Sequence, residues 1–211
     1  FDCRESVRPM MFYTGDISQD GKSAKFKGNG WGLLRGSRYY SYYPYDAEGT
    51  VSTVHVDYSG QRQASDGSSA HLGAFDYMHS WVDVPSGEDD AINIRYRRIG
   101  CTAKMVFAIP EKYRTSAFTS LTLSAGNAIF MTSGVYDPSR EYPARGTNGQ
   151  AETVTFSGRQ MSGAFTIDLG GAQGIECDTD GKLTIYAMMS PTAWAGQNIE
   201  VRLDGQKSGS K

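Results

Sequence analysis

The sequence has little that would build helices or cross a membrane. The best helical candidate, residues 110–118, opens with a proline, but it is short and its apolar spacing is weak, so we expect at most a turn or two there. No run approaches about 18 consecutive apolar residues, which excludes a transmembrane helix. The first residues lack a charged start followed by an apolar run, so any signal peptide has been removed or was never there.

Cysteines are few and charge is balanced. Cys3, Cys101 and Cys177 lie far apart and form no CxxC pair, which argues against zinc and thioredoxin-type sites and leaves the pairing of Cys3 open. Cys3 follows no lipobox, so it is not expected to be the lipidated residue. The net charge is −2, with 21 basic and 23 acidic residues mixed along the chain, so nucleic acid is not an expected partner.

Motifs for catalysis or metal binding are also missing. The chain has three histidines, His55, His71 and His79, and no HExxH; on one straight strand His71 and His79 would lie about 26 Å apart. GxSxG and phosphate-binding loops are absent, and residues 178–181 resemble only the start of a calcium loop. We therefore expect no metal, no cofactor and no enzyme activity. An all-β glycoside hydrolase stays open as a third hypothesis, because no acid pair can be selected from the sequence.

What the sequence does have is alternation of apolar and polar residues. Val54, Val56 and Tyr58 share one face of a predicted strand, and the same period of two recurs at 92–97, 103–109, 120–124, 153–158, 165–170, 182–188 and 198–205. Turn signals separate these runs, including Asp180-Gly181, expected to close a hairpin, and Asp204-Gly205. We predict an all-β fold, a two-sheet β-sandwich, as one domain over residues 1–211 with loose ends at 1–6 and 206–211. Residues 139–150 are the best candidate for a flexible loop.

The segment RYYSYYPYD, residues 38–46, raises two alternatives. On a strand, Tyr40 and Tyr42 share one face, and Tyr39 and Tyr43 share the other, which Tyr45 continues. Such a strand can lie in an aromatic-rich core, with each hydroxyl reaching water or a partner. Alternatively, Tyr39, Tyr43 and Tyr45 form a bare aromatic platform that binds sugars.

Four stretches resemble the fimbrillin-like family, the surface pilins and pilus-associated lipoproteins of Bacteroidales-type bacteria. Residues 31–46 are similar to the family's tryptophan or glycine segment and aromatic strand ending in Tyr-Tyr-Pro. Residues 54–80 are similar to its Q-x-Q segment followed by Asp-Tyr-Met. Residues 92–109 match two strands around a break, which reads Tyr-Arg-Arg here instead of the usual Phe-x-His, and residues 183–203 resemble the late strand, loop and closing strand.

The resemblance implies an N-terminal-type domain with a transthyretin-like Greek key. It further implies export, lipid anchoring through a segment outside this chain, and display at the outer membrane. Arg4 and Arg8 match the family's processing site only by position, and Pro9 makes Arg8 a poor cleavage site. The expected function is a structural or accessory fimbrial subunit that pairs edge strands with other subunits and adheres to a surface glycan or protein. The alternative is a carbohydrate-binding surface module that uses exposed tyrosines.

Overall fold

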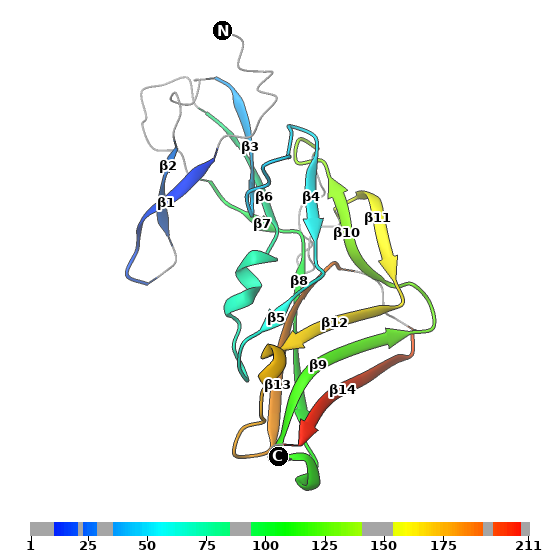
Figure 1. The fold of residues 1–211 in the computed structure, drawn as a ribbon. Coiled ribbons are helices and arrows are strands. Elements are labelled where there is room, and N and C mark those ends of the chain that lie inside the picture. The colour runs from blue at the N-terminus through cyan, green and yellow to red at the C-terminus, as the bar shows by residue number, and fades with distance from the viewer. Residues whose placement is uncertain are drawn as a thin grey trace.

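Almost all regular structure in the protein is β-strand. The computed structural model describes residues 11–20, 23–28, 36–84, 94–140, 154–191 and 196–207 (Figure 1). Within these ranges the helical elements are three short 3-10 turns: η2 (Ala70–Ala74), η3 (Glu111–Tyr113) and η4 (Gly171–Gln173). None of the described helices is long and apolar enough to span a membrane. The predicted all-β fold is therefore confirmed, and η3 agrees with the expectation of at most a turn or two over residues 110–118.

Two stacked layers form one end of the molecule. One is a four-stranded sheet in the order β14-β9-β12-β5, and the other is an antiparallel pair, β13-β8. The strands of these two layers are β5 (Arg62–Gln63), β8 (Cys101–Ala108), β9 (Ser116–Ala125), β12 (Ala164–Leu169), β13 (Lys182–Met189) and β14 (Ile199–Lys207). The pairing of β5 with β12 is parallel, and the others in these layers are antiparallel.

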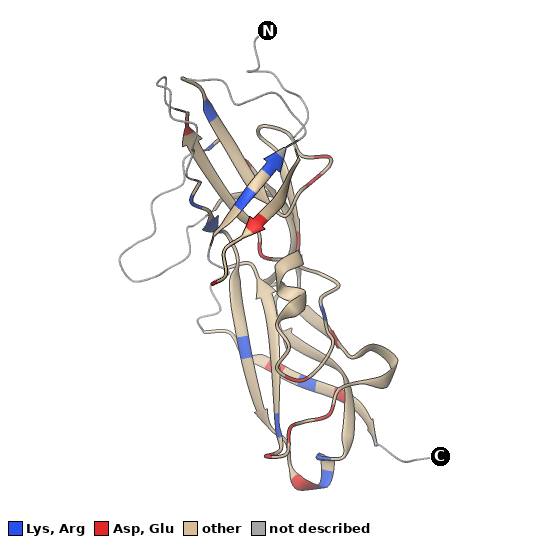
Figure 2. Cartoon of the chain, turned by 90° about the vertical axis from the view of Figure 1, so that its left-hand side faces the viewer, with Lys and Arg blue, Asp and Glu red and all other residues tan. Residues whose placement is uncertain are grey.

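Three smaller sheets continue toward the other end. Their strand orders are β11-β10-β4, β3-β6-β7 and β1-β2. The strands are β1 (Phe12–Ile17), β2 (Ala24–Gly28), β3 (Arg38–Tyr43), β4 (Val54–Asp57), β6 (Met78–Asp83), β7 (Arg97–Arg98), β10 (Phe130–Tyr136) and β11 (Phe156–Ser162). Figures 1 and 2 show an elongated molecule with β1, β2 and β3 at one end and β9 and β14 toward the other, and with acidic and basic residues interspersed along the described chain.

One hydrophobic cluster unites the strands, as the alternation predicts. Val54 and Val56 are each 1% exposed and Tyr58 is fully buried. The same cluster contains the inward residues of the two stacked layers, Leu121, Leu123, Phe165, Ile167, Leu169, Leu183, Ile185 and Ala187. Burying one face of each strand against another sheet is what holds the layers together, because each large apolar side chain contributes roughly 1.5–3 kcal/mol when fully buried. The Greek-key connectivity stays a prediction.

Several local predictions need correction. Gly181 has the positive φ of a tight turn (77°), but β13 then pairs with β8 rather than with the residues before the turn, so no hairpin forms there. Asp204-Gly205 is not a turn; it lies inside β14, at a shift of register against β9. Ile94 to Tyr96 are not in a strand, and only Arg97–Arg98 pair. These errors share a cause: the local pattern does not reveal the distant pairing partner.

The histidines and the chain ends also differ from expectation. His71 lies in η2 and His79 in β6, so the two do not share a strand. β14 continues to Lys207, so Gln206 and Lys207 belong to the sheet rather than to a loose end. Cys101 and Cys177 are free thiols. Predictions for residues 1–6, 31, 88–90, 92–93, 141–150 and 208–211, which include Cys3 and Arg4, lie outside the described residues, as do those for Arg8 and Pro9.

Candidate functional site: strand edges and exposed aromatic side chains

The outer edge of β13 is closed by glutamine side chains. Thr184, Tyr186 and Met188 direct their backbone N–H and C=O groups away from β8. Gln61 donates its amide N–H to the Met188 carbonyl (2.6 Å) and accepts the Met188 N–H (2.8 Å). Gln63 donates to the Thr184 carbonyl (2.8 Å) and accepts the Tyr186 N–H (2.8 Å). Both glutamines are almost fully buried, at 1% and 0% exposure, so these bonds replace the ladder of a missing strand.

Three neighbours complete the closure of this edge. The Thr184 N–H donates to the Asp66 carboxylate (2.6 Å), and the Gly67 N–H donates to the Thr184 carbonyl (3.0 Å). The His71 Nε2–H donates to the Tyr186 carbonyl (3.1 Å). Partial burial lowers the pKa of His71 although that hydrogen bond opposes the shift, so the imidazole is neutral at pH 7. Every outward backbone group of the three β13 residues therefore has a partner.

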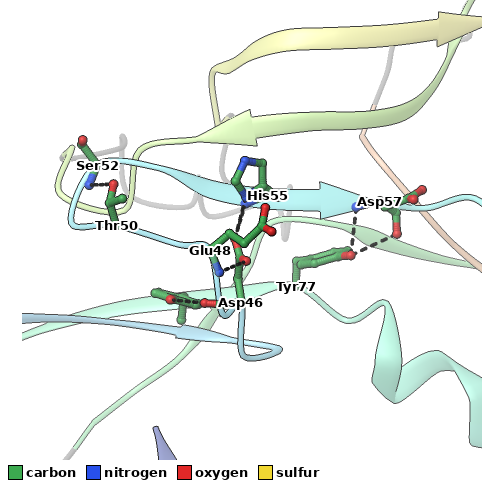
Figure 3. Close-up of polar contacts among 8 residues, drawn as sticks. Asp46, Glu48, Thr50, Ser52, His55, Asp57 and Tyr77 are labelled. Atoms are coloured by element: carbon green, nitrogen blue, oxygen red, sulfur yellow. Dashed lines mark hydrogen bonds and ion pairs between the residues drawn. The ribbon is translucent and has the colours of Figure 1, made fainter. Parts of the chain in front are cut away.

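Side chains also bond three of the outward backbone groups of β4, the His55 N–H and the N–H and C=O of Asp57 (Figure 3). The Asp46 carboxylate accepts the backbone N–H of His55 (2.9 Å), the His55 Nδ1–H (2.8 Å) and the Glu48 N–H (2.9 Å). The Tyr77 hydroxyl accepts the Asp57 N–H (2.9 Å) and donates to the Asp57 carbonyl (3.0 Å). Burial alone would raise the pKa of Asp46, but the N–H groups of His55 and Glu48 outweigh it and hold the pKa below its usual value.

A shallow hollow of about 330 Å³ lies beside this closed edge, and Tyr45, His55, Asp57 and Tyr77 line it. The His55–Asp46 pair orients an imidazole, as in acyl-transfer enzymes, but among the described residues no hydroxyl or thiol hydrogen-bonds to that imidazole. In the same part of the chain no three His, Cys, Asp or Glu side chains are grouped to hold a metal ion. The polar contacts at this edge therefore serve to satisfy backbone groups.

Among the strands that the structure describes, none closes the outer edge of β8. On β13, backbone groups alternate between the glutamines on one side and β8 on the other. The residues that exchange hydrogen bonds with β8 are therefore Leu183, Ile185 and Ala187. Their partners Phe107, Met105 and Ala103 bond inward, and the backbone groups of Thr102, Lys104, Val106 and Ala108 point away from β13. No described strand pairs with that side of β8, nor with the side of β14 that faces away from β9. Such free edges accept a strand from another chain.

Apolar side chains are left partly uncovered along both open edges. On β8, Met105 and Phe107 are only half-buried, although their partners Ile185 and Leu183 are fully buried. On β14 the core-facing row is Ile199, Val201 and Leu203, since these residues lie opposite Ala125, Leu123 and Leu121 of β9. Ile199 and Leu203 are half-buried and Val201 is 47% exposed.

Both rows pack toward the same hydrophobic cluster, which Met105, Phe107, Ile199 and Leu203 all contact. The layer that holds β14 has four strands, whereas the layer that holds β8 has two. Among the described residues, no strand of that layer lies on the outer side of β8. We use the name acceptor edge for the open edges of β8 and β14 together with the apolar rows beside them.

The three tyrosines of the predicted platform occupy different environments. Tyr39 is half-buried on β3, Tyr43 is 43% exposed at the end of β3, and Tyr45 is 44% exposed beyond it, in the hollow next to His55. The structure therefore does not align them on one strand. It places another aromatic pair together instead: Tyr40 of β3 lies directly opposite Trp81 of β6, and both are exposed. Trp81 was missed because its strand partner is 41 positions away.

No model of a known protein family matches the chain, and no curated protein is significantly similar to it.

Proposed function

We propose that this chain is a non-enzymatic structural or accessory subunit of a bacterial surface fimbrium and that it joins a neighbouring subunit by accepting a strand at β8. The observation that carries the proposal is the acceptor edge, where unpaired backbone groups of β8 coincide with half-buried apolar side chains. An incoming strand would add backbone hydrogen bonds and cover Met105 and Phe107 at the same time. Alternate apolar residues on that strand would face the same core.

The closed edges support this choice of site. The outward backbone groups of Thr184, Tyr186 and Met188 on β13 all have partners, and on β4 the His55 N–H and both Asp57 groups are bonded to side chains, so these edges are poor templates for strand addition. β8 is eight residues long, and four of its residues, 102, 104, 106 and 108, direct backbone groups outward. Completing the burial of a half-exposed large apolar side chain contributes on the order of 1 kcal/mol. Several such side chains together favour a stable junction.

The resemblance to fimbrillin-like proteins supports the cellular setting. It implies export, anchoring through a lipid, and display at the outer membrane. The all-β fold agrees with that family's architecture. A module that binds carbohydrate through aromatic side chains is the second candidate function, because large aromatic side chains are exposed on β3 and β6.

The decisive experiment blocks the edge without touching the β8–β13 ladder. In Val106→Pro the outward N–H is removed and the ring projects from the edge, whereas Val106→Thr keeps the N–H and the branched shape. Val106 is 53% exposed, so neither change opens a cavity. Each variant replaces the natural protein in the source bacterium, and immunogold electron microscopy and sheared fimbrial fractions report incorporation.

We expect Val106→Thr to enter fimbriae at the natural level and Val106→Pro to be made, exported and excluded. Incorporation of Val106→Pro at the natural level would refute strand addition at β8. Absence of the natural protein from the fimbrial fraction would refute the fimbrial function itself.

A further inference from the structure

The outward face of the β3–β6 pair carries two adjacent aromatic rings. Tyr40 and Trp81 are direct partners in the antiparallel register, so their Cβ atoms lie about 4.5–5.5 Å apart on one face. Tyr40 is 37% exposed and Trp81 is 40% exposed. Both rings are therefore held on a sheet and open to solvent on the same side.

A neutral ion pair borders the rings. Arg38 and Asp83 are the next partners along the same face. The Arg38 guanidinium donates to both Asp83 carboxylate oxygens, at 2.7 and 3.0 Å, and its central carbon lies 4.5 Å from the centre of the Trp81 ring. This double contact fixes the guanidinium over one face of the indole, so a ligand can pack on the other face of the Trp81 ring. The charges of the Arg38–Asp83 pair cancel, and Arg97 of β7, the partner of His79, lies further along the same face.

The opposite face of this sheet is attached to the rest of the protein. Tyr39 and Ser41 lie opposite Val82 and Ser80, and all four are half-buried or buried. The Ser41 and Tyr96 hydroxyls are hydrogen-bonded to each other across this covered face. On the face of Tyr40 and Trp81 the next pair, Tyr42 and His79, is half-buried and buried, so the exposed part of that face is its Arg38 end.

We infer that Tyr40 and Trp81 form a platform for a neutral oligosaccharide. The C–H-rich face of a pyranose ring is apolar and packs on an aromatic ring, while its rim of hydroxyl groups needs donors and acceptors. Arg38 and Asp83 place planar donors and acceptors beside the rings. Because Arg38 and Asp83 already compensate each other, this pair offers no unpaired charge to a charged glycan.

The exposed area of the Tyr40–Trp81 platform fits a sugar ligand better than a protein partner. A stable protein interface buries about 800 Å² on each partner, far more than two partly exposed side chains offer. Tyr40 and Trp81 are of the size that one or two sugar rings cover. β3 and β6 also lie toward the end of the molecule away from β14 (Figure 1), so a sugar bound there leaves the β14 side of the acceptor edge free.

The test uses variants with matched exposure. Tyr40→Ala and Trp81→Ala remove the platform, while Tyr43→Ala and Tyr45→Ala remove tyrosines of similar exposure elsewhere, 43% and 44%. The probes are hexasaccharides of β-1,4-glucan, β-1,3-glucan and α-mannan, with oligogalacturonate as the charged comparison. Isothermal titration calorimetry measures affinity, and the thermal midpoint confirms that each variant folds.

We expect at least one neutral hexasaccharide to bind, oligogalacturonate not to bind, and each platform variant to lose at least about tenfold in affinity. The Tyr43 and Tyr45 variants should stay within about twofold of the natural chain. The inference is overturned if no neutral probe binds, if the platform variants bind normally, or if the Tyr43 and Tyr45 variants lose as much. None of these results depends on assembly, which the Val106 variants test separately.

Discussion

The side-chain amide of Gln63 takes the place of a neighbouring strand beside Tyr186, accepting the Tyr186 N–H at 2.8 Å. Gln61 does the same at Met188. The two glutamines are two positions apart, and so are the β13 residues Tyr186 and Met188 whose N–H groups they accept. The segment that carries the glutamines runs antiparallel to β13, with Gln61 opposite the later residue. The backbone groups on the outer edge of β13 are thus hydrogen-bonded to side chains, which leave no place for a further strand to pair.

The first prediction concerns this closure. Gln63→Leu keeps the buried volume but leaves the Tyr186 N–H without an acceptor. It also removes one donor from the Thr184 carbonyl, which keeps the Gly67 N–H, and one donor from the Ser65 carbonyl. An unsatisfied buried backbone group costs about 1–3 kcal/mol, so the free energy of unfolding should fall by that amount. Urea denaturation followed by circular dichroism measures this loss.

The neighbouring arginine provides the matched control. Arg62 alternates to the other side of the same short strand, its side chain is 61% exposed, and its closest carboxylate oxygen, on Asp168, is 3.7 Å away. Arg62→Ala should change the unfolding free energy by no more than about 0.5 kcal/mol. Equal losses in the Gln63 and Arg62 variants would show that the edge closure contributes nothing.

The strands themselves were predictable because their cause is local. Burial of one face demands a period of two, and Val54, Val56 and Tyr58 follow it with nearly complete burial. Leu183 and Ile185 do the same in β13. The alternation of apolar and polar residues is therefore visible in the sequence and does not depend on which strand pairs with the one that carries it.

The pairing partners were not predictable, because they depend on contacts far apart in the sequence. The turn at Gly181 was correctly placed, yet β13 pairs with β8, where Leu183 lies opposite Phe107. The buried glutamines show the same limit at the site. Gln61 and Gln63 look like surface residues of a polar segment, and only the position of β13 reveals what they bind.

A second prediction tests the bulge in β14. A Cβ on Gly205 would lie 2.6 Å from the Ala117 carbonyl oxygen, which is backbone and cannot rotate away. Gly205→Ala should therefore cost about 1–3 kcal/mol through local displacement of β14 from β9. Gly126→Ala is the control, since a Cβ there meets nothing within 4 Å. Similar urea midpoints for the two variants would contradict the crowding at Gly205.

A third prediction follows from Asp46, whose folded-state pKa is held below its ordinary value. A carboxyl with a depressed pKa stabilises the fold above its unfolded pKa, near 3.9, and loses that stabilisation as the pH falls through the folded value. Asp46→Asn should lower the unfolding free energy by about 1–2 kcal/mol at pH 7. The difference from the natural chain should shrink below about pH 3.

Urea unfolding at pH 7 and pH 3 measures this dependence on Asp46. Glu48→Gln is the control, because the contact of Glu48 with Asp46 uses its backbone N–H rather than its exposed carboxylate. It should change the unfolding free energy by no more than about 0.5 kcal/mol at pH 7. A deficit of Asp46→Asn that is equally large at both pH values would show that ionisation of Asp46 is not what matters.

The last prediction separates folding of the subunit from its assembly. Val201 faces the core side of β14 but is 47% exposed, so Val201→Asp leaves the new carboxylate in water while the subunit is alone. A strand added at β8 that also covers the apolar row of β14 would bury this position, and burying an unpaired carboxylate is strongly unfavourable. The variant should keep its thermal midpoint and be excluded from fimbriae in the immunogold assay. Glu200→Ala, on the opposite face of the same strand, should be incorporated normally. Normal incorporation of Val201→Asp would show that the row on β14 stays uncovered in the assembled fibre and that the junction is formed by β8 alone.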